Sequence, residues 1–372
     1  MTMWIMIMWT TIAFVITSIF YLSSRVPNLL EFSNIVEWES FKCFSLGLLI
    51  TLGVTGIIAL CIDFMNALVC VMYVAMIWAV GDFAFWLLGK FGITFSHYYA
   101  GWIALVVAAA ALIFGWYSAH HVWVTKYDLI TEKDVNNLRV AMFADSHIGT
   151  TFSGKEFAKH IAAIQSENPD VVLVVGDYVD DGTNKENMIE ATENLGKLKT
   201  KYGTYFVFGN HDKGYYGPAH RGFDAAELVE ELTKNGIKVL RDESVLLDDK
   251  FYLIGRRDFS TIKEHRGTRA SMAELIKDLD ESKYMIVLDH QPTDHVNQRK
   301  SGVDLVLNGH THGGQLFPFN QVGKWIGAND MIYGHEKHEN TDFIVTSGIS
   351  DWAIKFKTGT KSEFVIINTR KE

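Results

Sequence analysis

Four long apolar stretches in the first 125 of the 372 residues constrain the fold more than any other feature of the sequence. A hydrocarbon core about 30 Å thick is crossed by roughly 20 apolar residues in a helix. Each stretch is long enough for one crossing, and Trp and Tyr gather near the stretch ends, as they do at membrane interfaces. We therefore predict four transmembrane helices, at about Trp4–Leu22, Phe44–Ile62, Phe64–Leu88 and Tyr99–Val124.

The distribution of charge divides the chain at the end of the fourth stretch. Residues 1–125 hold 8 charged side chains, whereas residues 126–372 hold 69 and no cysteine. The charged part therefore uses no disulfide, cysteine metal ligand or cysteine nucleophile. Its excess of acidic residues argues against a nucleic acid partner. We predict a membrane domain over residues 1–125 and a globular domain over residues 126–372.

Basic residues near the stretch ends bear on the orientation in the membrane. Arg25, Lys42 and Lys90 lie in loops on one side, and Lys126 follows the last stretch on the other side. Basic residues concentrate in cytoplasmic loops. This pattern favours a multi-pass protein of the cell membrane whose globular domain is extracytoplasmic.

Few ionisable groups lie inside the apolar stretches. Asp82 could act as an ion or proton relay, or it could lie near the interface, where it would snorkel or cap a helix. No second ionisable group lies deep in another stretch, so we interpret Asp82, His120 and His121 as interfacial residues. A transporter is disfavoured for the same reason.

From Val140 onward, short apolar runs alternate with amphipathic segments. Continuous β-branched runs such as Val171–Val175 are typical of buried strands, and residues 157–164 have helical spacing. This alternation predicts an α/β domain, and the many strands near the C-terminus favour mixed sheets. We expect strands near Val239 and at Phe251–Ile254 to pair as a hairpin.

Side chains that can bind metal follow five of the predicted strands. The carboxyl ends of parallel strands lie at one edge of a sheet, so groups from distant parts of the chain can converge there. Carboxylate and amide oxygens mixed with imidazoles suit divalent ions, and seven ligands suit two ions that share a carboxylate. The candidate ligands are Asp145, His147, Asp177, Asn210, His290, His310 and His312.

Five spaced motifs follow one another along residues 138–369: Asp-x-His at 145–147, Gly-Asp at 176–177, Gly-Asn-His-Asp at 209–212, a strand-terminal His290 and Gly-His-x-His at 309–312. This series resembles the calcineurin-like metallophosphoesterase family. Residues 309–318 are similar to a membrane-associated bacterial branch and its animal relatives with several spans. The resemblance implies the metallo-dependent phosphatase fold, a four-layer sandwich of two mixed sheets between helices.

The resemblance also implies a set of ligands for two divalent ions, which would be Mn, Fe or Zn. The first ion would be held by Asp145, His147 and His312, the second by Asn210, His290 and His310, and Asp177 would bridge the two. No ligand position departs from the family pattern, so an active enzyme is expected. Asp180 stands where purple acid phosphatases carry a tyrosine ligand, so a tyrosine–iron site is not expected.

The reaction that this resemblance implies is hydrolysis of a phosphoester or diphosphate bond. A metal-bound hydroxide would attack phosphorus in line. His211 would protonate the leaving group, and Asp212 would orient the His211 imidazole. Arg256 and Arg257 follow a predicted strand and could clamp a phosphate. Alternatively they form a solvated loop, in which Asp258 pairs with one of them.

The number of predicted helices is a clue to the substrate. A single helix would be enough to anchor an enzyme that acts on a soluble substrate. We therefore expect a phosphorylated lipid or a lipid-linked substrate. UDP-diacylglucosamine, whose diphosphate is cleaved in lipid A synthesis, is a specific candidate and requires a cytoplasmic site. A membrane receptor or scaffold that only binds phosphorylated ligands is the alternative, although binding alone needs neither His211 nor Asp212.

Overall fold

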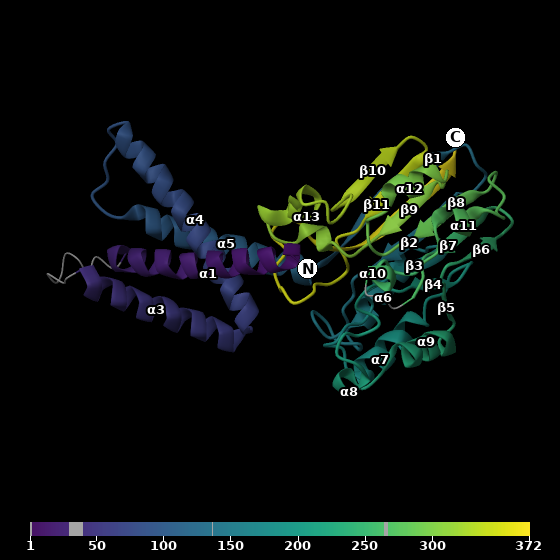
Figure 1. The fold of residues 1–372 in the computed structure, drawn as a ribbon, viewed down its shortest axis with the longest axis horizontal. Helices are drawn as coiled ribbons and strands as arrows, with labels where there is room; N and C mark the ends of the chain where they lie inside the picture. Colours follow the sequence, from purple (N-terminus) through teal and green to yellow (C-terminus); the bar gives the residue numbers. More distant parts are fainter. Residues whose placement is uncertain (1, 30–39, 136, 264–266) are drawn as a thin grey trace. The chain divides into compact units, whose positions relative to one another are not determined.

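The computed structural model describes residues 2–29, 40–135, 137–263 and 267–372 (Figure 1). The chain forms two compact units, Met1–Gly115 and Trp116–Glu372. We expected the domain boundary about ten residues later, at residue 125. Each unit is described by itself.

Four helices begin in the first unit, and each is long and apolar enough to cross a membrane. They are α1 (Thr2–Leu29), α3 (Ser40–Cys61), α4 (Phe64–Lys90) and α5 (Tyr99–His120). The prediction of four long apolar helices is confirmed. Helix α1 continues seven residues beyond its predicted end at Leu22. The Ser23 and Ser24 hydroxyls donate to the carbonyls of Ile19 and Tyr21, at 2.7 Å each, so these polar residues do not interrupt the helix.

Asp82 of α4 lies at the centre of a polar cluster in the first unit. Its Oδ2 atom accepts a hydrogen bond from the Tyr21 hydroxyl at 2.7 Å and lies 2.8 Å from Nε of Arg25. The Tyr98 hydroxyl donates to the same carboxylate. Asp82 therefore pairs with a basic residue of α1, a partner that sequence reasoning did not identify, and it does not cap a helix.

The second unit contains two six-stranded mixed sheets. The first has the order β1-β12-β2-β3-β4-β5, formed by Val122–Thr131, Ser362–Lys371, Leu138–Phe143, Val171–Val175, Thr204–Val207 and Ile237–Val239. The second has the order β10-β11-β9-β8-β7-β6, formed by Gly334–His338, Thr341–Val345, Leu305–Asn308, Tyr284–Leu288, Phe251–Gly255 and Glu243–Leu247. The β12–β2, β10–β11 and β6–β7 pairs are antiparallel and the other pairs are parallel.

Helices cover the outer face of each sheet, and an apolar core fills the space between the sheets. Buried residues of α6 (Phe157–Ser166), α7 (Lys185–Leu195) and α9 (Ala225–Lys234) pack on the first sheet. Residues of α11 (Met272–Ile276) pack on the second, and a third cluster joins the facing sides of both sheets. Figure 1 shows these layers, with α6, α7 and α9 along one side of the strands. The predicted four-layer sandwich is confirmed.

Short helices complete the second unit. They are α8 (Pro218–Arg221), α10 (Ser260–Lys263), α12 (His295–Lys300), α13 (Val322–Trp325) and the 3₁₀ turns η1 (His312–Gly314) and η2 (Phe319–Gln321).

Two sequence expectations about the elements are wrong. The fourth apolar stretch was expected to stay helical to Val124, but α5 ends at His120 and Val122 begins strand β1. Residues 122–131 pair in parallel with β12, and their β-branched residues suit a strand. The hairpin partner of β7 is β6, whereas β5 joins the other sheet beside β4.

The register of the central strands determines where the site forms. Strands β2, β3 and β4 are parallel neighbours, with Val140 opposite Val171 and Val172 opposite Thr204. Strands β8 and β9 are parallel in the other sheet, with Ile286 opposite Leu305. The segments that follow these five strands carry all seven candidate ligands.

Candidate metal centre

Five of the seven candidate ligands lie in the left-handed backbone region. The φ angle is 56° at Asp145, 37° at His147, 51° at Asp177, 73° at His310 and 48° at His312. Residues other than glycine rarely adopt such angles, and they persist where the surrounding structure enforces them, often at functional sites. Each angle turns the chain sharply at the end of a buried strand.

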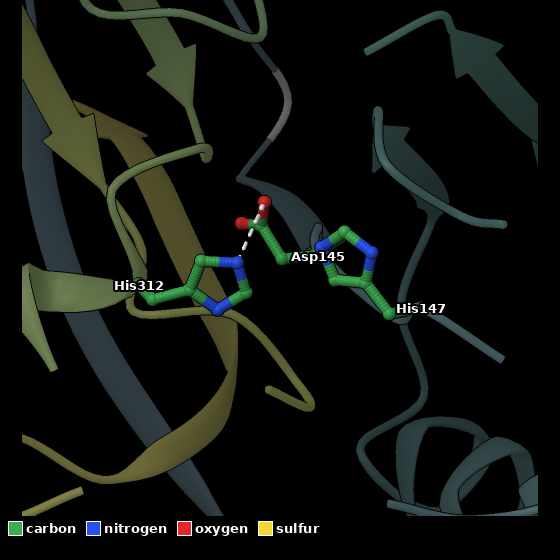
Figure 2. Close-up of side chains that lie close together, drawn as sticks. All are labelled: Asp145, His147 and His312. Atoms are coloured by element: carbon green, nitrogen blue, oxygen red, sulfur yellow. Dashed lines mark ion pairs between the residues drawn. The ribbon is translucent and has the colours of Figure 1, made fainter. Parts of the chain in front are cut away.

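The first ligand group consists of Asp145, His147 and His312, which come from two different sheets (Figure 2). One ligand atom from each lies within 4.8 Å of the others, and all three residues are buried. Nε2 of His312 lies 3.8 Å from Oδ1 of Asp145. The backbone N–H of His310 donates to both Asp145 oxygens at 3.0 Å, which holds the carboxylate against the segment after β9.

The second group consists of Asp177, His290 and His310, again with ligand atoms within 4.8 Å of one another. Oδ2 of Asp177 lies 3.0 Å from Nε2 of His290 and 3.9 Å from Nε2 of His147, which belongs to the first group. The Asp177 carboxylate therefore lies between the two groups, as a carboxylate shared by two metal ions must.

Hydrogen bonds orient two of the imidazoles by their Nδ1 atoms. Nδ1 of His147 lies 3.1 Å from Oδ2 of Asp180, and Nδ1 of His290 lies 2.8 Å from the Val175 carbonyl oxygen. The buried Nε2 atom of His147 has no hydrogen-bond partner among the described residues, and Nε2 of His290 faces the Asp177 carboxylate at 3.0 Å. Metal-binding histidines typically have this arrangement. The sequence distinguishes Asp180 only by its spacing from Asp177, so its contact with His147 was not predicted.

Asn210 presents its carbonyl oxygen in the same manner. Its Nδ2 atom donates to the Tyr215 hydroxyl at 3.1 Å. Its buried Oδ1 atom has no hydrogen-bond partner among the described residues. Unsatisfied buried acceptors and imidazole nitrogens beside carboxylates are what a divalent ion would satisfy. The residues therefore fit two bound metal ions.

The electrostatic environment lowers the pKa of two of the histidine ligands and raises the pKa of a third. Burial lowers the pKa of His312 and, together with the charge of His290, lowers the pKa of His310 to about 4. Both imidazoles are thus neutral, the form that coordinates a metal. Burial opposes the charged form of His290 too, but the Asp177 and Asp145 carboxylates outweigh it and raise the pKa of His290 well above its usual range.

His211 lies beside the two groups. Its backbone N–H donates to Oδ1 of Asp177 at 2.8 Å, and the centroid of its ring lies 5.2 Å from that of His147. Its ring also contacts the rings of Trp352 and Tyr215, with centroids 5.0 and 5.3 Å away. The sequence offered no signal for Trp352, which lies 141 positions further along the chain.

The structure gives Asp212 a role different from the one expected. Its two carboxylate oxygens accept four backbone N–H bonds of 2.7 to 3.0 Å, from Asp177, Tyr178, Val179 and Gly209. Asp212 therefore joins the segments after β3 and β4. The expectation that it orients the His211 imidazole is wrong, because both carboxylate oxygens face the backbone of these segments.

The two arginines proposed as a phosphate clamp separate in the structure. Arg256 is buried, and its Nη1 atom lies 3.0 Å from Oδ2 of Asp289 and 2.8 Å from Oδ2 of Asp294. Its guanidinium is therefore held within the fold, and the expectation that it clamps a phosphate is wrong. Arg257 is exposed, with Nε 3.6 Å from Asp242. Asp258 accepts from Gln291 at 3.0 Å and pairs with neither arginine.

Basic side chains line a cavity of about 390 Å³. Lys213, Arg241 and Arg257 line it, with Phe208 and the buried Asp258. Lys213 directly follows Asp212, and Asp258 is hydrogen-bonded to the residue after His290. Burial and the charge of Arg257 lower the pKa of Arg241, as expected for two guanidinium groups that face one space.

Two glycines allow the loops to approach one another. A Cβ atom on Gly209 would lie 2.1 Å from Oδ1 of Asp177. A Cβ atom on Gly309 would lie 2.5 Å from Cβ of Ala144 and 2.6 Å from Oδ2 of Asp145. The glycine before Asn210 and the glycine before His310 are thus required by close contact at the centre.

Comparisons with known proteins agree with these motifs. A family model described as Calcineurin-like phosphoesterase matches residues 138–314. An uncharacterized metallophosphoesterase of Campylobacter jejuni is 32% identical over 237 residues, which cover 63% of this chain and 59% of that protein. A transmembrane protein with metallophosphoesterase domain from Danio rerio is 29% identical over 276 residues, which cover 71% and 61%.

A metallophosphoesterase of Aquifex aeolicus is 31% identical over 212 residues, which cover 56% of this chain and 77% of that protein. The chain spans about three fifths of the length of the Campylobacter and Danio relatives. The motifs, the two-sheet fold and these similarities agree: the chain belongs to the calcineurin-like metallophosphoesterase family.

Proposed function

We propose that this protein is a membrane-anchored phosphohydrolase that cleaves a phosphoester or diphosphate bond with two divalent metal ions. The observation that carries the proposal is the pair of ligand groups, all buried except the half-buried His310, with Asp177 between them. The membrane domain would comprise the four apolar helices, and the hydrolase domain would begin with strand β1 at Val122, a few residues before the boundary that the sequence predicts at residue 125.

The proposed ligands follow the two groups. Asp145, His147 and His312 would hold one ion, Asn210, His290 and His310 the other, and Asp177 both. The orientation of His147 and His290 by their Nδ1 atoms and the open Oδ1 atom of Asn210 support this assignment. The donor set suits Mn, Fe or Zn. When bound, two such ions neutralise phosphate oxygens and lower the pKa of a coordinated water to about 7.

The chain itself would supply the proton for the leaving group. His211 contacts Asp177 through its backbone and carries its ring beside His147. The Trp352 and Tyr215 rings restrict its orientation. His211 would thus donate a proton to the departing oxygen. Asp212 would act as a positioning residue, because its carboxylate joins the backbone that carries Asp177 to the backbone before Asn210.

A direct assay tests the proposal. The full chain, purified in detergent, is assayed on bis-p-nitrophenyl phosphate with Mn, Fe or Zn added separately. Asp145→Ala should abolish hydrolysis, and His211→Ala should lower kcat by about 10²- to 10⁴-fold. His338→Ala, on the exposed strand β10, is the control for loss of a histidine. Unchanged activity in both site variants would refute the assignment.

Arg257 would contact the substrate together with Lys213 and Arg241. Three basic side chains around one cavity suit a second anionic group, such as the second phosphate of a diphosphate. In Arg241→Gln and Arg257→Gln, KM should rise more for a diphosphate substrate than for bis-p-nitrophenyl phosphate. An equal change for both substrates would contradict this contact.

The substrate would be a phosphorylated lipid or a lipid-linked phosphate, because four membrane-length helices exceed what an anchor requires. In this proposal the protein is multi-pass in the cell membrane, and Arg25, Lys42 and Lys90 favour an extracytoplasmic catalytic domain. UDP-diacylglucosamine is the specific alternative. Protease digestion of the catalytic domain in intact spheroplasts would exclude that alternative, and lipid analysis of cells that lack the protein would identify the substrate that accumulates.

A further inference from the structure

Exposed aromatic side chains of residues 121–372 lie in segments that adjoin the residues of the metal centre. Among the described residues of 121–372, the exposed Trp, Tyr and Phe side chains fall in three segments, which follow His211, follow His312 or contain Trp352. Single exposed apolar residues are normal on a soluble surface, whereas a cluster marks an interaction site. We call the cluster the aromatic rim: Tyr215, Tyr216, Phe317, Phe319, Trp325 and Trp352.

Two of these segments contact His211, and two of them are hydrogen-bonded to each other. The Trp352 and Tyr215 rings both contact the ring of His211. The side-chain amide of Gln315 donates to the Ile354 carbonyl oxygen at 2.6 Å, and the backbone N–H of Phe317 donates to Oγ1 of Thr358 at 3.0 Å. The loops after η1 and after Trp352 therefore form one continuous edge.

Three side chains of the aromatic rim are mostly exposed to solvent. Trp325 is 73% exposed, Tyr216 77% and Phe317 60%. Trp and Tyr combine an apolar body with a polar tip, and they are enriched at membrane–water interfaces. Moving the apolar rings of such side chains from water into an apolar environment is favourable.

The same edge contacts the end of helix α5. The ring centroid of Trp116 lies 5.6 Å from that of Phe356, and the Ala119 carbonyl oxygen accepts a 2.7 Å hydrogen bond from Oγ of Ser362. Helix α5 has 22 residues and is long and apolar enough to cross a membrane. Its final turn, residues 116–120, would then lie at the interface, where Trp and Tyr are common.

We infer that the aromatic rim inserts into the membrane–water interface, and that a lipid phosphoester reaches the metal centre from the bilayer along this rim. The inference rests on the proposed phosphohydrolase function and specifies its substrate as an amphiphile taken from the membrane. The occupant of the rim is the lipid bilayer, because the helix that contacts the rim edge is itself of membrane length. A partner protein or a second copy of the chain is an alternative outcome of the test.

The decisive measurement is the depth of the rim in a membrane, which does not depend on activity. Trp325→Cys is spin-labelled in the full chain, with Cys43, Cys61 and Cys70 replaced by alanine. The protein is reconstituted in vesicles of phosphatidylethanolamine and phosphatidylglycerol. Val296→Cys is the matched control, because Val296 is a 53% exposed apolar residue of α12 outside the rim.

Three outcomes are distinguishable by collision of the label with oxygen and with a water-soluble nickel chelate. Preferential collision with oxygen at position 325, and with nickel at position 296, supports insertion. Preferential collision with nickel at both positions overturns it. Exclusion of both reagents at position 325 indicates cover by protein and also overturns it.

A kinetic measurement tests entry of the substrate from the bilayer. The ratio of activity on phosphatidic acid in these vesicles to activity on bis-p-nitrophenyl phosphate is compared between variants. Phe317→Ser combined with Trp325→Ser should lower this ratio about tenfold, and Val296→Ser should leave the ratio at the wild-type value. An unchanged ratio in the double variant overturns entry along the rim. A wild-type chain inactive on both substrates refutes the proposed function, while the depth measurement still decides insertion.

Discussion

Nδ1 of the His147 imidazole lies 3.1 Å from the Asp180 carboxylate, and both side chains are buried. This bond directs Nε2 of His147 toward Asp177, 3.9 Å away. Burial raises the pKa of Asp180, but the hydrogen bond from His147 outweighs it and holds that pKa below its usual value. An ionised Asp180 therefore fixes the tautomer and the orientation of a proposed metal ligand.

Asp180→Ala should weaken metal binding by about 10- to 100-fold, because outer partners of metal-binding histidines typically contribute that much. Calorimetric titration of the metal-free protein with Mn measures the change in the dissociation constant. Asp249→Ala, at a carboxylate whose side chain is 82% exposed, should bind metal as the wild type does. Wild-type affinity in Asp180→Ala would show that the bond does not support the site.

Gly309→Ala should disrupt both the fold near the site and metal binding. The added Cβ would lie 2.6 Å from Oδ2 of Asp145 and 2.5 Å from Cβ of Ala144, so the segment before His310 must move. We expect a loss of about 1–3 kcal/mol in the free energy of unfolding, typical of overpacking, and weaker Mn binding. Gly89→Ala, where the structure leaves open space, is the control. A stable, metal-binding Gly309→Ala variant would contradict the close approach.

Arg256→Met should destabilise the second unit by at most about 3–5 kcal/mol, because the buried Asp289 loses one charged partner but keeps its contacts with Arg269 and Gln298. Denaturant unfolding in detergent measures the loss. Arg257→Met, at an exposed side chain, should change the free energy of unfolding by less than about 1 kcal/mol. Equal stability of the two variants would argue that Arg256 is not a structural residue.

The buried His160, which is not a metal ligand, should make the stability of the protein depend on pH. Burial, with a contribution from Lys159, lowers the pKa of His160 from 6.5 to about 4. The unfolded chain therefore binds a proton in this window that the folded chain does not. The stabilising contribution is complete above pH 6.5 and is lost as the pH falls toward 4, up to about 3 kcal/mol.

The variant His160→Phe should flatten this dependence, because it preserves a ring beside Phe152, 4.6 Å away between centroids in the wild type, and removes the titrating group. Melting temperatures at about pH 7 and about pH 4.5 measure the difference between variant and wild type. His338→Phe, on an exposed strand, should retain the wild-type dependence. Identical pH profiles for wild type and His160→Phe would exclude His160 as the cause.

Much of the fold could be predicted from local patterns. Apolar length alone located the four helices, and the β-branched run Val171–Val175 identified a central strand. Strand β1 was missed because Val122 and Trp123 continue the hydropathy of α5, and only pairing with β12 makes them a strand. The pairing of β5 was predicted wrongly for a similar reason. Its partner strand is decided by packing and not by its own three residues.

The sequence by itself determined which residues can carry the chemistry. Asp145, Asp177, Asn210, His290 and His310 each follow an apolar strand, and an α/β fold brings such strand ends together whatever their separation in the chain. The distribution of charge likewise separated the apolar helices from the domain that carries these residues.

Only the tertiary structure decided how individual side chains are used. Arg256 pairs with Asp289, Asp212 binds backbone N–H groups, and Asp180 orients His147. The pairing of a charged or polar side chain depends on which groups surround it after folding, because burial without a partner is costly. Spacing along the chain does not encode those neighbours, so the sequence identified the ligands but not the residues that hold them in place.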